Sequence, residues 1–428
     1  MTRKLKGIVP LCGVVAVGIA STLTAMRLQP PTRESLADAN LTLPKGFQAT
    51  IFADGLDRAR HLAVNSKGEV FVKLDKLKEG KGIIFLQDIN GDGKADKQTG
   101  FGDFKGTGLA IHDGFLYASS NKDIYRFKLD ADGRVADGTT PEIIVKGLID
   151  RHMHESKSIT LDDQGNIYTN IGAYSNACQT EDRVKGALGM KPCPILDSAG
   201  GIWRFKADKE GQIYGDGTRY ATGLRNVVGL DWNRQLNHLF VMQHGRDQLH
   251  DLYPNYFTTK QSAELPAETL YELNEGDNAG WPYLYYDQIQ HKKILSPEYG
   301  GDGQKEGDPK AISPAAAFPG HMAPDGLVFY TGTKFPARYH NGAFIAFHGS
   351  WNRAPEPQAG YFVVFQPFVN GKPSGKWEVF ANGFAGKAQV TSPGDAEHRP
   401  CGLAIGPDGS LFVSDDTKGT IYKISYKG

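Results

Sequence analysis

The chain has 428 residues, more than most single domains, with the composition of a folded protein at 40% hydrophobic and 11% aromatic residues. Lys+Arg and Asp+Glu are both 48, so the formal net charge is zero. The chain therefore lacks the surplus of basic residues that is typical of nucleic-acid-binding proteins. Its 52 glycines are spread along the sequence, which favours many turns over long helices.

The first 26 residues predict an export segment. A positively charged start, Arg3 to Lys6, precedes an apolar stretch from Gly7 to Ala25. Leu23 stands where a cleavage site prefers a small residue, so cleavage and retention as a membrane anchor both stay open, with a buried N-terminal helix as a weaker alternative. Polar residues 27–42 read as a linker. The folded domain is then 43–428, in the periplasm or outside the cell.

Three cysteines lie in the predicted folded domain. Cys178 and Cys193 flank one loop, and an oxidising compartment favours a disulfide between them. Cys401 is left over and is expected to be a buried thiol. The sequence contains no CxxCH haem motif, so a redox enzyme of this sequence would pass its electrons to a separate carrier, a quinone or a cytochrome.

One phrase recurs six times along the chain. It consists of alternating apolar residues, a turn with Asp or Asn and Gly, and a second run rich in aromatic and β-branched residues, which together predict a β-hairpin. The six copies are His61 to Val72, Gly108 to Ser119, Ser158 to Asn170, Gly229 to Met242, Ala323 to Phe347 and Gly402 to Ser414.

Several copies are followed by a further strand, such as Ile124 to Asp130 after the second, so each unit is expected to be a small antiparallel sheet. Such sheets bury both faces by stacking around an axis. The sequence therefore predicts an all-β fold, a six-bladed β-propeller. A β-sandwich or an open solenoid is the alternative.

The segment from Asp88 to Asp96 carries oxygen-bearing side chains at alternating positions. Asp88, Asn90, Asp92 and Asp96 are spaced in a way that suits a hard cation such as calcium. Thr99 stands where a calcium loop of the EF-hand type has its bidentate Glu. A structural calcium site and an acidic turn without metal are both open interpretations.

Polar clusters lie at equivalent ends of the predicted inner strands. His152 and His154 precede the third repeat, and a histidine there could serve as a general base. Arginines recur at the same place in other units, where a closed propeller would gather them at one mouth of its channel: Arg60, Arg225, Arg246, Arg353 and Arg399. Several guanidinium groups in one site indicate an anionic ligand, such as a small polycarboxylate or a phosphate.

At these clusters the sequence resembles the pyrroloquinoline quinone (PQQ)-dependent glucose/sorbosone dehydrogenase family, which is a six-bladed propeller. The phrases that carry the resemblance are GLRNVVGLDW, QHGRD, EGDNAGWPY, HMAPDGLVFY, FHGSWNR and RPCGLAIGPDGSLFVSDD. They span nearly the whole chain after Leu43. FHGSWNR and RPCG resemble the branch of sorbosone and pyranose dehydrogenases most.

The resemblance implies oxidation of a sugar, an aldose or a sorbosone-like aldehyde, by hydride transfer to PQQ with calcium at the quinone. His154 matches the family's catalytic base, which takes the proton of the substrate hydroxyl. The positions that match cofactor-binding residues are Arg225, Asn226, His321, Arg353 and Arg399, with Asp415 nearby. The carbonyls of Gly245 and Arg246 match calcium ligands, and Asp247 lies beside them.

Two features depart from the family. Arg246 replaces the proline of the glucose branch, and the family's cofactor lysine has no clear match, with Arg353 standing nearest. Two other functions remain as alternatives: a non-catalytic propeller that binds a glycan or a protein partner, and a calcium-dependent lactonase. The lactonase would need a cage of carboxylates and asparagines around its metal, and the arginines argue against it.

Overall fold

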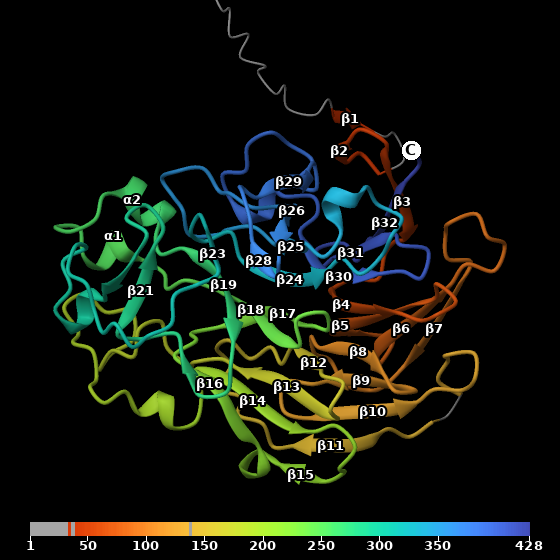
Figure 1. Ribbon diagram of the computed structural model, residues 1–428, viewed down its shortest axis with the longest axis horizontal. Coiled ribbons are helices and arrows are strands. Elements are labelled where there is room, and N and C mark those ends of the chain that lie inside the picture. The colour runs from red at the N-terminus through yellow and green to blue at the C-terminus, as the bar shows by residue number, and fades with distance from the viewer. Residues whose placement is uncertain (1–32, 36–38, 137–138) are drawn as a thin grey trace, which may run out of the picture. The chain divides into compact units, whose positions relative to one another are not determined.

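The computed structural model describes residues 33–35, 39–136 and 139–428, and strands dominate this part of the chain (Figure 1). Six sheets of four or five strands form the six blades of a β-propeller, as the repeats predict. The predicted export segment lies outside the described residues. Within the described ranges, no helix is long and apolar enough to cross a membrane.

The first three blades follow one another along the chain. Blade 1 contains β4 (Ala59–Val64), β5 (Val70–Lys78), β6 (Lys81–Gln87) and β7 (Lys97–Phe101). Blade 2 contains β8 (Leu109–His112), β9 (Phe115–Ser119), β10 (Ile124–Lys128) and β11 (Glu142–Lys146), with β15 (Gln212–Ile213) at its edge. Blade 3 contains β12 (Ile159–Leu161), β13 (Asn166–Ile171), β14 (Gly201–Lys206) and β16 (Thr218–Thr222), with β20 (Asp277–Asn278) at its edge.

The other three blades complete the ring. Blade 4 contains β17 (Val227–Asn233), β18 (His238–Gln243), β19 (Glu268–Leu273) and β23 (Ala316–Phe318). Blade 5 contains β24 (Pro324–Phe329), β25 (Ala343–Phe347), β26 (Phe362–Gln366) and β29 (Glu378–Ala381). Blade 6 contains β30 (Pro400–Ile405), β31 (Leu411–Asp415), β32 (Ile421–Tyr426) and, from the other end of the chain, β3 (Phe47–Ala53).

The remaining elements are short. Three hairpins lie outside the blades: β1 (Arg33–Ser35) with β2 (Thr42–Pro44), β21 (Leu284–Asp287) with β22 (Lys292–Leu295), and β27 (Phe368–Val369) with β28 (Lys372–Pro373). The helices α1 (Leu249–Leu252) and α2 (Thr259–Glu264) lie in the loop after β18, beside β21 (Figure 1). The 3₁₀ helices are Pro194–Asp197, Tyr214–Asp216, Pro297–Tyr299, Ala337–Tyr339 and Pro393–Asp395.

The ring is closed by pairing the two ends of the folded domain. β3 pairs antiparallel with β32, from Phe47 opposite Tyr426 to Ala53 opposite Ile421. The inner strands β4, β8, β12, β17, β24 and β30 contact one another in sequence, and β30 contacts β4 again. An open sandwich or solenoid would lack that last contact, so the ring confirms the propeller.

The hairpin turns are stabilised by the residues that predicted them. The Asp162 Oδ1 atom accepts hydrogen bonds from the backbone N–H groups of Gln164 (2.9 Å) and Asn166 (2.8 Å). Gly165 has a φ of 74°, a backbone conformation that other residues adopt only with strain. Asn65 in blade 1 caps its own turn in the same way. The recurring Asp/Asn and Gly therefore have a local structural reason.

Apolar side chains fill the space between neighbouring blades. The Tyr168 ring of blade 3 stacks on the Trp232 indole of blade 4, with ring centroids 5.2 Å apart. Phe240 of blade 4 packs against Phe329 of blade 5 at 4.9 Å. Each fully buried aromatic side chain contributes about 2 kcal/mol of hydrophobic stabilisation, so these contacts hold the blades in a fixed ring.

The ring of inner strands encloses a cavity of about 190 Å³. Its lining is mostly apolar and comes from all six inner strands, with polar side chains at His61, Thr160 and Asp231. A wider cavity of about 660 Å³ lies at the turn ends of these strands, among residues 64–66, 331–334 and 405–409. None of the predicted site residues lines that wider cavity. The site must therefore be sought at the other end of the inner strands, where they begin.

Candidate functional site

Two predicted site residues, His154 and Asn226, come together beside Gly172, which follows β13. A Cβ atom placed on Gly172 would lie 2.5 Å from the Cβ of His154 and 3.3 Å from the Oδ1 of Asn226. The backbone N–H of Ala173 donates to the carbonyl of Arg225 (2.8 Å). The predicted base and the predicted cofactor-binding pair, Arg225 and Asn226, are thus neighbours in space, although about 70 residues of chain separate them.

The hydrogen bonds of His154 define its chemical state. Its Nδ1 lies 2.5 Å from the carbonyl oxygen of Ala173, which can only accept, so Nδ1 carries the proton. Burial, reinforced by the positive charge of Arg225, lowers the pKa of His154 to about 3. The ring is therefore neutral at physiological pH, and Nε2 is a bare nitrogen able to accept a proton.

Arg225 and Asp247 form the central ion pair of the site. The Nη2 of Arg225 donates to Oδ2 of Asp247 at 2.7 Å, and its Nη1 donates to the carbonyl of Gly245 at 2.9 Å. The same Oδ2 accepts from Arg183 at 2.7 Å. Burial alone would raise the pKa of Asp247, but Arg225, His321 and Arg183 hold it well below its usual range. One carboxylate here accepts from two guanidinium groups, and Asp182 is a second carboxylate beside Arg183, 3.6 Å from its Nε.

Among the described residues, two predicted cofactor-binding side chains have a buried polar atom without a hydrogen bond, and a third, Arg399, has no carboxylate partner. The Nε of Arg225 and the Oδ1 of Asn226 are buried and make no hydrogen bond. The guanidinium of Arg399 donates to the carbonyls of His348 (3.2 Å) and Gly349 (2.5 Å), and no carboxylate lies within 4.0 Å of it. Unmatched buried polar groups are costly, so the arginines fit an anionic group of a ligand, whereas the Asn226 oxygen fits a hydrogen-bond donor.

Two other predicted cofactor residues, His321 and Arg353, make their hydrogen bonds to protein groups. His321 Nε2 donates to the carbonyls of Ser262 (2.8 Å) and Leu265 (3.0 Å). The guanidinium of Arg353 donates to the carbonyls of Ala263, Gly320 and Pro357 and to Glu264 (2.6 Å). Both side chains thus hold the segment around α2.

Asp415 is fully buried and accepts hydrogen bonds at the entrance to blade 6. Its Oδ1 accepts from the backbone N–H of Arg399 at 2.7 Å, and its Oδ2 lies 2.8 Å from the Nδ1 of His398. It therefore fixes the backbone of Arg399.

A group of buried charges lies where four inner strands begin, and only part of it was predicted. Arg60 donates to Asp416 (2.8 Å) and lies 3.5 Å from Asp325. His348 Nε2 lies 2.6 Å from Asp416, and His244 Nε2 lies 3.3 Å from Asp325. These five residues compensate one another's charge, so Arg60 is occupied by carboxylates and is not free for an anion.

Two of the groups predicted to hold calcium, the Gly245 carbonyl and the Asp247 carboxylate, are engaged with guanidinium groups. The Gly245 carbonyl accepts from Arg225, and the carboxylate of Asp247 accepts from Arg225, Arg183 and Asn352. The side chain of Arg246 pairs with Glu298 at 2.5 Å. A cation beside Gly245 would meet the charge of Arg225, so the arrangement in this structure does not fit a metal ion without a shift of that side chain.

The loop from Asp88 to Asp96 uses its oxygens as backbone caps. Asp88 accepts from the N–H groups of Gly91 (2.7 Å) and Gly93 (2.8 Å), and Asp96 accepts from Ile89 (2.7 Å). Among the described residues, the acidic and imidazole groups close enough to share a metal are Asp150, His152 and Glu155, on the exposed approach to blade 3.

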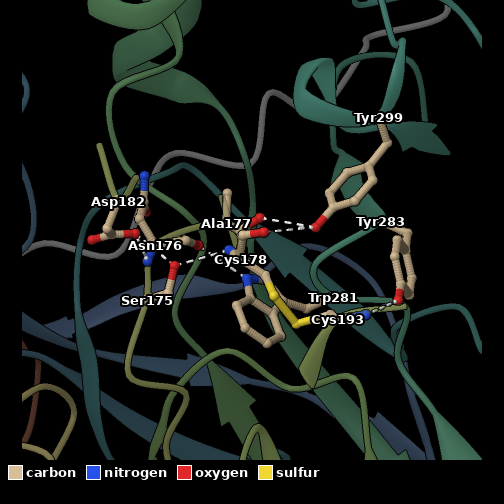
Figure 2. The surroundings of a disulfide bond; sticks show 9 residues. All are labelled: Ser175, Asn176, Ala177, Cys178, Asp182, Cys193, Trp281, Tyr283 and Tyr299. Carbon is tan, nitrogen blue, oxygen red and sulfur yellow. Dashed lines mark hydrogen bonds between the residues drawn. A yellow bond between two sulfur atoms is a disulfide. The ribbon is translucent and has the colours of Figure 1, made fainter. Parts of the chain in front are cut away.

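The predicted disulfide between Cys178 and Cys193 is present (Figure 2). Cys401 is a buried free thiol. The bridge lies in the insert between β13 and β14 that also contains Ala173 and Asn176. Sequence reasoning missed Asn176, Arg183, Asp325 and Asp416 as parts of the site. Asp325 and Asp416 lie inside phrases that carry the family resemblance, but nothing in the sequence of the insert marks Asn176.

Comparison with known proteins gives a consistent picture. A family model described as TrAA12-like matches residues 41–427. An uncharacterised protein of Borreliella burgdorferi is 25% identical, covering 91% of this chain and 92% of the relative. The PQQ-dependent pyranose dehydrogenase of Coprinopsis cinerea is 24% identical over 95% of this chain, which spans only 56% of that enzyme's length.

Solved structures share the fold at lower identity. The AA12-family carbohydrate-active enzyme of Trichoderma reesei superposes with a TM-score of 0.73 at 19% identity, covering 92% of this chain and 100% of the other. The PQQ domain of the Coprinopsis cinerea pyranose dehydrogenase superposes with a TM-score of 0.70 at 20% identity, covering 92% and 98%. At this identity, the likeness supports the six-bladed propeller.

Proposed function

This chain belongs to the TrAA12-like family, and on that premise we propose that it is an oxidoreductase that oxidises a sugar with PQQ as its cofactor. The observation that carries the proposal is the position of a neutral, Nδ1-protonated His154 beside Gly172, where Asn226 also lies and where the charge of Arg225 lowers the pKa of His154. A base and an anion-binding arginine in one site are what the oxidation of a sugar hydroxyl by an anionic quinone requires.

Each protein group has a defined part in this proposal. Arg225 and Arg399 would hold the carboxylates of the cofactor, because Arg225 has a buried N–H group without a partner and Arg399 makes no ion pair among the described residues. When bound, PQQ supplies the two-electron acceptor for the hydride of the sugar. The Nε2 of His154 accepts the proton of the sugar hydroxyl, and the Ala173 carbonyl keeps the ring in the tautomer that leaves Nε2 free.

In this proposal, three of the predicted cofactor residues support the site without touching the cofactor: His321, Arg353 and Asp415. They position α2 and the backbone of Arg399, and they reach the cofactor only if their present hydrogen bonds are exchanged. A sugar with a free anomeric hydroxyl, an aldose or a sorbosone-like hydrate, is the substrate class we propose.

Calcium remains part of the proposal and has its own test. An ion at the carbonyls of Gly245 and Arg246, with Asp247, requires Arg225 to turn from Gly245 toward the cofactor. A structural ion at Asp88, Asn90, Asp92 and Asp96 requires their carboxylates to leave the backbone caps. We expect calcium to raise the affinity for PQQ if the first site forms, and only the melting temperature if the second forms.

We also propose that the protein is exported and passes its electrons to a separate acceptor, a quinone or a cytochrome. The buried Cys178–Cys193 disulfide supports an oxidising compartment. Sequencing the N-terminus of protein recovered from the cell envelope would distinguish a cleaved signal peptide from a retained membrane tether.

The proposal as a whole is tested by reconstitution. Purified protein is titrated with PQQ, with and without calcium, and its absorption spectrum is recorded before and after rapid mixing with a panel of aldoses. We expect saturable binding of PQQ and bleaching of the oxidised quinone by at least one aldose. Protein that binds no PQQ under either condition would refute the proposal and favour a non-catalytic binding propeller.

A further inference from the structure

The insert between β13 and β14 is fixed at both ends of its disulfide loop. Trp281 Nε1 donates to the carbonyl of Asn176 at 3.0 Å, and Tyr299 donates to the carbonyl of Ala177 at 3.1 Å (Figure 2). The backbone N–H of Cys193 donates to the hydroxyl of Tyr283 at 2.8 Å. Three aromatic side chains thus hold the insert in place against the segment between β19 and β23.

The side chain of Asn176 is directed at the site and is completely buried. Its Oδ1 accepts from the backbone N–H of Asp247 at 2.8 Å, and its Nδ2 donates to the carbonyl of the same residue at 3.1 Å. An amide that satisfies both backbone groups of one residue fixes its position and its orientation. Because Asp247 pairs with Arg225 at 2.7 Å, Asn176 stands two contacts away from the proposed cofactor site.

Arg183 makes a second connection from the same insert. Its Nη2 donates to the Oδ2 of Asp247 at 2.7 Å, and its Nη1 donates to the side chain of Gln248 at 2.9 Å. Asn176 therefore fixes the backbone of Asp247, while Arg183 fixes its carboxylate.

The conformation of the segment around Asn176 is itself rigid. Asp182 accepts from the hydroxyl of Ser175 at 2.6 Å and from the backbone N–H of Asn176 at 2.8 Å (Figure 2). The Ser175 oxygen in turn accepts from the N–H of Cys178 at 2.9 Å, next to the disulfide. The bridge closes a loop with a sequence separation of 15 residues, which restricts the unfolded and partly open states of this segment.

The same segment also contacts the base. Gly172 lies against His154, the carbonyl of Ala173 accepts from the Nδ1–H of His154, and the N–H of Ala173 donates to the carbonyl of Arg225. One short stretch, 172–176, therefore touches both halves of the proposed site. A displacement of this stretch would change the position of His154 relative to Arg225.

We propose that Asn176 and Arg183 are positioning residues: through Asp247 they set the orientation of Arg225 relative to His154, and the disulfide-closed insert is their support. This inference rests on the proposed function. It assigns a role in the reaction to a segment that neither touches the sugar nor holds the cofactor.

The test compares N176A with N166A. Asn166 is a matched control because it is a buried amide in the same blade, bonded to Asp162 (2.7 Å) and Lys206 (2.9 Å), at the far turn of β13. Equilibrium dialysis measures the dissociation constant for PQQ. We expect N176A to weaken PQQ binding at least about tenfold and N166A to leave it within about twofold, although both lower the melting temperature.

A second measurement uses protein without cofactor. Histidine-selective ¹⁵N NMR reports the tautomer and the titration of His154, which in the wild type is the neutral Nδ1–H form between about pH 5 and 8. We expect N176A to show a mixture of tautomers and a pKa closer to the ordinary value, and N166A to match the wild type.

These two measurements separate the inference from the proposed function. If the wild type binds no PQQ, the proposed function fails, and the NMR comparison still decides the inference. A wild-type tautomer pattern in N176A overturns the inference, and so does a wild-type dissociation constant. If N176A does not fold, R183Q takes its place, because Arg183 is partly exposed and its removal leaves the backbone clamp intact. Wild-type values for R183Q in both measurements overturn the inference equally.

Discussion

Gly172→Ala would test how closely the position of His154 controls turnover. The new Cβ would lie 2.5 Å from both the Cβ and the backbone oxygen of His154. Contacts of a Cβ atom below 3.4 Å are rare, so His154 would have to retreat by about 0.9 Å, the difference between 3.4 and 2.5 Å. A misplacement of about 1 Å at a reacting group can cost about 100-fold in rate.

We therefore expect the rate of PQQ reduction at saturating sugar to fall about 100-fold in G172A. The affinity for PQQ should change much less, because the guanidinium contacts of Arg225 and Arg399 do not involve the displaced atoms. Overpacking should also lower the free energy of unfolding by about 1–3 kcal/mol. Stopped-flow absorbance gives the rate, and urea unfolding gives the stability.

Gly217→Ala is the matched control for this prediction. Its Cβ would lie 2.5 Å from the Phe205 ring, an equally close contact in the same blade but away from the site. G217A should lose similar stability and keep its rate of PQQ reduction. If G172A turns over as fast as G217A, the position of His154 does not limit the reaction, and the assignment of this residue as the base is wrong.

Three further predictions concern other parts of the site. Burial and the charge of Arg225 lower the pKa of His154 to about 3, so its Nε2 stays unprotonated above that pH. The rate of PQQ reduction should therefore show no inflection near pH 6.5. An inflection there that the substitution H154Q removes would contradict the low pKa. C178S/C193S should lose about 3 kcal/mol of unfolding free energy for its 15-residue loop, measured by urea unfolding, and an unchanged midpoint would contradict this. R225A should weaken PQQ binding by at least about tenfold, measured by equilibrium dialysis. It should also lower the free energy of unfolding by about 3 kcal/mol, because it leaves the buried carboxylate of Asp247 without this partner. Wild-type affinity for PQQ in R225A would show that Arg225 does not bind the cofactor.

The sequence was sufficient for the fold because the fold is repetitive. Each of the six predicted hairpins corresponds to an inner strand and its neighbour, for example Ser158 to Asn170 to β12 and β13. The turns depend only on contacts within a few residues, such as Asp162 to Gln164, so a single sequence shows them. Closure by β3 was not predicted, because the pairing of Phe47 with Tyr426 leaves no local pattern.

The site was predictable in position and less so in its contacts. The register of the repeats places Arg60, Arg225 and Arg399 at the beginning of inner strands. What each guanidinium binds depends on residues far away in the sequence: Arg60 pairs with Asp416, 356 positions later, and Arg353 with Glu264, 89 positions earlier. No sequence pattern marked Asn176 as part of the site. It lies in an insert that occurs in one blade, and such an insert lacks the periodicity by which the repeats were recognised.

These pairings decide which arginines can bind an anion. Arg60 faces Asp416 and Asp325, so its charge is already compensated. Arg225 shares Asp247 with Arg183, and the Arg399 guanidinium donates to two backbone carbonyls and lies over the Tyr361 ring. Among the described residues, Arg399 therefore has no carboxylate partner, and Arg225 has one buried N–H group, at Nε, without a hydrogen bond. Arg225 and Arg399 both lie where inner strands begin. Arg225, the one nearer to His154, pairs with the carboxylate of Asp247. The disulfide-closed insert in turn fixes Asp247, through the side chain of Asn176.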